Sequence, residues 1–204
     1  VMAMRQMSLD LDEEEDLAAR VMEKMNSEND SVLKDRIKVC DGRLPKGAPA
    51  TFLNNAKMVK LITDWWKVAM KNPSSWKCKG TDNNIYTFLN DYLTAYKEVF
   101  PEAWDNKNYV LTKTMGFDII FSICNQLTLN VVDISGVNRL PDKDAFVSIL
   151  QKVFFTKDDS GNMVPVEVEL DGENAVPFNW ESSIYGSHSS GKGINILKKI
   201  VEQL

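Results

Sequence analysis

Apolar residues recur along most of this chain at spacings of three and four, the repeat of an α-helix that buries one face. The pattern predicts helices over residues 10–27, 51–71, 81–100, 109–126, 141–155 and 189–204. The second and third begin at a threonine that can cap them, Thr51 or Thr81, and Pro141 fits the first position of the fifth. Gly116 weakens the early part of the fourth, because glycine is a poor helix former.

Two stretches alternate between apolar and polar residues, which is typical of short strands. They are residues 32–40 and residues 163–170, and Pro165 places the second strand at a sheet edge. Residues 127–134 fit a strand or an extension of the preceding helix equally well. We therefore expect residues 1–204 to form one mainly α domain of five to six helices with a small β element.

Composition adds three expectations about the setting of the protein. No apolar run is long enough to span a bilayer and no signal segment opens the chain, so we expect no membrane partner. The cysteines, Cys40, Cys78 and Cys124, are too scattered for a disulfide scaffold, which favours a cytoplasmic location. The first residue is Val1 and the opening resembles the middle of a protein, so we expect the C-terminal part of a longer one.

The charge is distributed unevenly along the sequence. Residues 1–30 carry nine acids and three bases, whereas residues 31–115 carry fourteen bases and eight acids. Residues 116–204 are acidic again, with seven bases and twelve acids. The basic middle could be a surface for an anionic partner, or simply the solvated face of lysine-rich helices.

Aromatic and basic side chains are interleaved in this middle region, a pattern that can bind nucleic acid through phosphate contacts and base stacking. Trp66, Tyr92 and Tyr96 fall on predicted apolar faces, which favours the core for these three, whereas Trp65 and Trp76 do not. The segment NPSSWKCKG is predicted to be a loop. If any stretch contacts DNA, we expect this loop and the helix end before it, with the candidate residues Trp76, Lys77, Lys79, Lys67 and Lys71.

Near the C-terminus, GSHSSGKG differs by one residue from the phosphate-binding loop G-x-x-x-x-G-K-[ST]. Gly193 stands where the metal-binding Ser or Thr should be, and the preceding VPFNWESSIY is too polar for a central strand. We interpret the segment as a turn that starts the last helix, with Ser189, Ser190 and Lys192 as candidate anion contacts. Nucleotide binding by the Gly186–Gly193 loop remains the alternative.

The sequence offers no set of residues for catalysis or for a metal. The three cysteines and the only histidine, His188, lack the paired spacing of a zinc site. His188 is also the only possible base for a nucleophile, and no G-x-S-x-G motif accompanies it. We therefore expect a non-catalytic protein without a cofactor.

One longer stretch, NNIYTFLNDYLTAYKEVFPEAWDNKNYVLTKTMGFDIIFSI, resembles the C-terminal part of bacterial DGQHR-domain proteins, which include the DndB-like proteins of DNA phosphorothioate modification. LAARVMEKMNSENDSVLKDRIKV and SSGKGINIL are similar to the segments that flank that part of the family. The namesake Asp-Gly-Gln-His-Arg motif is absent, so no motif residue can be carried over.

The resemblance implies a role in bacterial DNA modification or phage defence, with DNA as a partner. It does not imply enzymatic activity in this part. The leading hypothesis is a non-catalytic helical domain of this family that acts in DNA binding or protein assembly. A helical interaction or self-association module outside that context is the other alternative.

Overall fold

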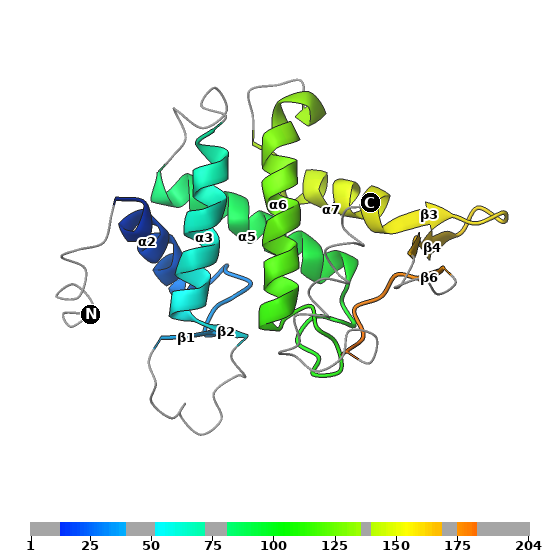
Figure 1. Cartoon of the computed structure of the whole chain (residues 1–204), viewed down its shortest axis with the longest axis horizontal. Coiled ribbons are helices and arrows are strands. Elements are labelled where there is room, and N and C mark those ends of the chain that lie inside the picture. The colour runs from blue at the N-terminus through cyan, green and yellow to red at the C-terminus, as the bar shows by residue number, and fades with distance from the viewer. Residues whose placement is uncertain (1–12, 40–51, 72–80, 136–139, 169–174, 183–204) are drawn as a thin grey trace. The chain divides into compact units, whose positions relative to one another are not determined.

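The structure is a computed structural model that describes residues 13–39, 52–71, 81–135, 140–168 and 175–182, with only the backbone for 129–135. Helices dominate these residues, which confirms the predicted mainly α class (Figure 1). The helices are α2 (Glu13–Ser27), α3 (Asn55–Ala69), α5 (Asp82–Val99), α6 (Thr114–Ser135) and α7 (Lys143–Phe154).

The β element consists of three two-stranded sheets with very short strands. Strands β1 (Ile37–Lys38) and β2 (Leu53–Asn54) are parallel. The other two sheets are antiparallel, and they pair β3 (Phe155–Lys157) with β4 (Met163–Pro165) and β5 (Glu167–Val168) with β6 (Val176–Pro177). Both predicted strand regions contain strands, but the first is reduced to two residues because Val32 to Asp35 form a turn instead. The second is divided into β4 and β5, which belong to different sheets.

The chain divides into two compact units. Unit 1 comprises Val1–Asn90 and Cys124–Leu140, and unit 2 comprises Asp91–Ile123 and Pro141–Leu204. Two of the three boundaries fall within helices, so α5 and α6 each contribute residues to both units, and the third lies between α6 and α7. That the two units form a single domain stays a prediction.

In unit 1, α2 packs along α3 in the antiparallel sense. The segment after α2 returns to the start of α3, because Ile37 in β1 pairs with Leu53 in β2. The side chain of Asn26 fixes this turn by accepting a hydrogen bond of 2.9 Å from the backbone N–H of Ile37. Helix α2 buries the face that its apolar spacing predicts, whereas α3 buries only part of its predicted face together with residues outside it. The core residues are Ala18, Val21, Met22, Met25, Met58, Leu61, Ile62, Trp65, Trp66 and Ala69.

Two predicted helix starts differ from the observed ones. Asn54 caps α3, accepting a hydrogen bond of 2.8 Å from the backbone N–H of Lys57, so the helix begins four residues after Thr51. Asp142 caps α7 in the same way, and Pro141 precedes the cap instead of occupying the first turn. In both cases a side chain that accepts the orphan N–H groups of the first turn decides the start. At α5 the predicted cap, Thr81, is confirmed.

In unit 2 the core is a cluster of aromatic rings from helices, short strands and connecting segments. The buried members are Tyr92, Tyr96, Phe146, Phe154, Phe178 and Trp180. Trp180 lies 5.2 Å from Phe178 and 5.9 Å from Phe154 between ring centroids. Backbone hydrogen bonds hold the segment that carries Phe178 and Trp180, because Phe178 N donates to Val166 O and Val110 N donates to Trp180 O.

Helix α6 settles the ambiguous stretch 127–134, which continues the helix as far as Ser135. The helix starts later than predicted, at Thr114 instead of residue 109, and its first turn contains the buried Gly116. A Cβ atom at Gly116 would lie 2.2 Å from the carbonyl oxygens of Val110 and Leu111. The glycine that weakened the sequence prediction is therefore required by the close approach of the preceding segment.

Candidate nucleic-acid interface

The described aromatic residues of the basic middle region are mostly core residues, although Phe52, Phe100 and Tyr109 are partly exposed. The described tryptophans and the other tyrosines are each at most 9% exposed, and they are Trp65, Trp66, Tyr86, Tyr92, Tyr96 and Trp104. Side chains buried to this extent cannot stack on bases. The remaining candidate for stacking, Trp76, lies outside the described residues.

Trp65 corrects the sequence analysis, which placed it off the apolar face of its helix. Its indole Nε1 donates a hydrogen bond of 2.9 Å to Thr128 Oγ1, and its ring stacks on Phe88 at 5.3 Å. Helix α3 is covered on more than one side, so its buried arc is wider than a single stripe of three- and four-residue spacing. The polar end of the indole is satisfied inside the core.

The two described residues of the predicted DNA-contact set lie at the end of α3. Lys67 occupies the last turn of the helix, and the exposed Lys71 follows one turn later. Both lysines therefore lie where the chain enters the segment that contains Trp76, Lys77 and Lys79. Cations in the last helical turn are also favoured by the helix dipole.

Lys67 has an acidic neighbour that sequence reasoning did not anticipate. Its Nζ lies 3.3 Å from Oε2 of Glu14, in the first turn of α2, and the two side chains are 49% and 40% exposed. The run of acids at Glu13–Asp16 is visible in the sequence. Only the antiparallel packing of α2 and α3 brings one of them to the end of α3.

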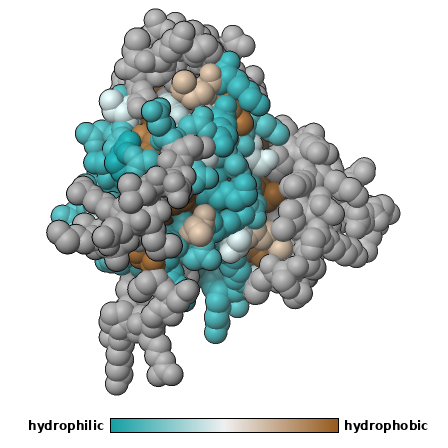
Figure 2. All heavy atoms as spheres, turned by 60° about the vertical axis from the view of Figure 1, so that its left-hand side comes forward, coloured by the Kyte–Doolittle hydropathy of each residue, from teal (hydrophilic) through white to brown (hydrophobic). Residues whose placement is uncertain are grey.

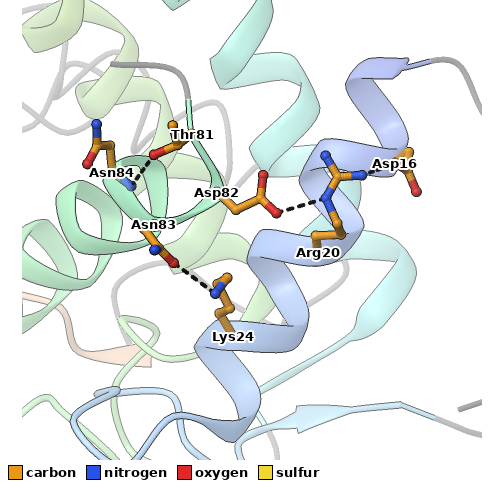
Figure 3. Close-up of polar contacts among 7 residues, drawn as sticks. All are labelled: Asp16, Arg20, Lys24, Thr81, Asp82, Asn83 and Asn84. Carbon is orange, nitrogen blue, oxygen red and sulfur yellow. Dashed lines mark hydrogen bonds and ion pairs between the residues drawn. The ribbon is translucent and has the colours of Figure 1, made fainter. Parts of the chain in front are cut away.

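The first turn of α5, the next described helix after α3, makes polar contacts with α2 (Figure 3). Arg20 Nε lies 2.8 Å from Asp82 Oδ2, and its guanidinium also contacts Asp16. Lys24 Nζ donates a hydrogen bond of 2.9 Å to Asn83 Oδ1. These cations are engaged with the α5 turn, so we assign them a structural role in fixing where α5 begins.

The surface around α2 is polar. Figure 2, which turns forward the side of Figure 1 where α2 lies, shows mostly hydrophilic described residues with hydrophobic ones in small separate patches. Sites that bind a protein partner through apolar contacts expose larger continuous patches. The described part of this face therefore presents a mainly hydrophilic surface.

The strongest pKa shifts belong to buried groups with structural partners. Burial raises the pKa of the Tyr86 hydroxyl, and its hydrogen bond to Asp30 raises it further. Burial also raises the pKa of Cys124, the described free cysteine. Neither group is prepared for nucleophilic attack, which needs a lowered pKa or an adjacent base.

Within the described ranges, no group of three or more His, Cys, Asp or Glu side chains is placed to hold a metal ion. None of the described helices has the length and apolarity that a membrane crossing needs. The candidate anion contacts Ser189, Ser190 and Lys192, like Lys77 and Lys79, fall outside the described residues.

Comparisons with known proteins leave the family open: no family model, curated protein or solved structure matches the chain. The resemblance to DGQHR-domain proteins stays a prediction that rests on the quoted sequence segments.

Proposed function

We propose that this chain is a non-catalytic, mainly helical domain that contacts DNA through the basic segment Lys67–Lys79. The contact residues in this proposal are Lys67, Lys71, Trp76, Lys77 and Lys79. The observation that carries it is the position of Lys67 in the last turn of α3 and of Lys71 just after the helix, directly before the remaining three.

Phosphate contacts would supply most of the affinity. Each lysine that neutralises a phosphate releases a condensed counterion, so binding should weaken steeply as salt rises. Trp76 is the single tryptophan of the segment, and one stacked base contributes only about 1–3 kcal/mol. A sequence-tolerant interaction with the DNA backbone therefore fits the segment better than specific recognition of bases.

The sequence resemblance supports the biological context of this proposal. A DGQHR/DndB-like protein would act in DNA modification or phage defence, in the cytoplasm, where scattered free cysteines persist. Protein assembly within that context is compatible with the same domain, and light scattering that shows only a monomer would remove its self-association form.

Binding of a short random-sequence DNA duplex and of the corresponding single strand, each at two salt concentrations, tests the proposal. The double variant Lys77→Glu, Lys79→Glu should lose most of the affinity at low salt. A matched control is Lys152→Glu, Lys157→Glu, which makes the same charge change at exposed positions of α7 and β3. No binding by the unaltered protein at low salt, or equal losses in both double variants, would exclude the proposed contact.

The alternative is a nucleotide site at Gly186–Gly193, supported by the spacing of Gly186, Gly191 and Lys192. Titration calorimetry with ATP or GTP should then show binding that Lys192→Ala abolishes. If the unaltered protein binds no nucleotide, this alternative fails.

A further inference from the structure

We propose that the acidic first turn of α2 shields the basic end of α3, so that Glu14 competes with DNA phosphate for Lys67. This inference rests on the proposed function and concerns the regulation of the same contact. It follows from one observed ion pair, from the packing that holds it, and from the charge around it.

The packing of unit 1 fixes the position of Glu14. The antiparallel arrangement places the start of α2 beside the end of α3, and the buried faces of both helices keep it there. The resulting distance between Glu14 Oε2 and Lys67 Nζ is 3.3 Å. Glu14 is thus held where an incoming phosphate would have to contact Lys67.

The surrounding charges strengthen this competition. Four consecutive acids, Glu13 to Asp16, occupy the first turn of α2, and of these Asp16 is engaged by Arg20. On α3, Lys60 lies about two turns before Lys67 and is paired with Asp64 at 2.7 Å. The potential at Lys67 is therefore less positive than the lysine content of the segment suggests.

The ion pair is weak enough to exchange. Both side chains are about half exposed, and an ion pair in such a position contributes little net free energy because water and salt screen it. A DNA phosphate can therefore displace Glu14, but each binding event must include this step. The acidic first turn of α2 thus competes with DNA for Lys67, which lowers the affinity for DNA but does not prevent binding.

Glu14→Gln in the full chain tests the inference. Its affinity for the random-sequence duplex at low salt should rise by about two- to fivefold, the range that the strength of an exposed ion pair allows. If Lys67 then gains a full phosphate contact, the slope of log affinity against log salt should steepen by up to about 0.9. The matched control is Glu23→Gln, which removes the same charge from an exposed position of α2 about two and a half turns away.

A second pair of variants separates the local effect from overall charge. In a Lys67→Gln background, Glu14→Gln should change the affinity no more than Glu23→Gln does. Equal gains from Glu14→Gln and Glu23→Gln in the unaltered background would overturn the shielding while leaving DNA binding intact. If no variant binds DNA at low salt, the proposed function fails and the shielding fails with it. Helix content measured by circular dichroism confirms that each exposed substitution leaves α2 folded.

Discussion

In unit 1 most core residues come from helices, and the spacing of apolar residues along each helix predicts much of its buried face. In unit 2 the rings that meet at the centre come from α5, α7, a short sheet and the segment that carries Phe178 and Trp180. Much of the core of unit 1 can therefore be predicted from the local spacing of apolar residues. The core of unit 2 depends on contacts between segments far apart in the sequence. The difference teaches that aromatic residues in apparently polar segments can be core residues when strand pairing positions them.

The largest expected effect tests the aromatic core of unit 2. Trp180 is 1% exposed and its ring lies beside those of Tyr96, Phe100, Phe154 and Phe178. Trp180→Ala should lower the free energy of unfolding by about 3–5 kcal/mol, since it removes a buried indole and leaves a cavity. Denaturant unfolding followed by circular dichroism measures this loss, and a change under 1 kcal/mol would contradict the assignment of Trp180 to the core.

A second test addresses the close approach of the backbone of Val110 and Leu111 to Gly116 in the first turn of α6. Gly116→Ala places a methyl group against two carbonyl oxygens, which should lower the free energy of unfolding by about 3 kcal/mol. Alanine is the better helix former, so the net loss should be about 2 kcal/mol. Gly161→Ala is the control, because a Cβ there meets nothing within 4 Å and only the φ of 83° opposes it. That strain should cost about 1 kcal/mol. Thermal unfolding of both variants should rank Gly116→Ala as the more damaging.

A third test compares one tryptophan from each unit. Trp65 Nε1 donates to Thr128, whereas Trp180 Nε1 has no hydrogen-bond partner among the described residues. Replacing each by phenylalanine removes a similar volume, so the difference should isolate the hydrogen bond. We expect Trp65→Phe to cost about 1 kcal/mol more than Trp180→Phe in denaturant unfolding. Equal losses would mean that the indole N–H of Trp65 adds nothing to the stability of unit 1.

The smallest expected effect is the pH dependence of two carboxylates in unit 2. Burial raises the pKa of Asp91 above 3.8, and the charge of Asp142 adds to the shift. The hydrogen bonds from Asn162 lower the pKa of Asp158 below 3.8. A raised carboxyl pKa means that the folded state binds the proton more tightly, so stability falls as pH rises above 3.8. A lowered pKa means that stability is lost as pH falls below 3.8.

Two variants separate these contributions. Relative to the unaltered protein, Asp91→Asn should gain stability as pH rises from 3.8 through the folded pKa. Asp158→Asn should be the less stable protein above 3.8, and its disadvantage should disappear on acidification below that value. Unfolding curves across acid pH measure both, and parallel pH profiles for all three proteins would show that neither shift contributes.

The fold class and most helices follow from the sequence, because the spacing of apolar residues records which face is buried. The sequence predicts the ends of those helices less well. Thr51 and Pro141 are acceptable at a helix start, but Asn54 and Asp142 accept the N–H groups that the first turn leaves unpaired. Residues 127–134 could not be assigned from their local pattern, and in the structure they continue α6.

Some features of the candidate site likewise follow from the sequence, and others depend on the tertiary structure. The sequence by itself determined that lysines cluster around Trp76 and that acids fill the start of α2, since both are properties of composition. Only the tertiary structure decided that Trp65 is a core residue and that Glu14 faces Lys67, since both depend on how α2, α3 and α6 pack. Periodicity describes one helix at a time, whereas burial and ion pairing depend on the surface of the neighbouring element.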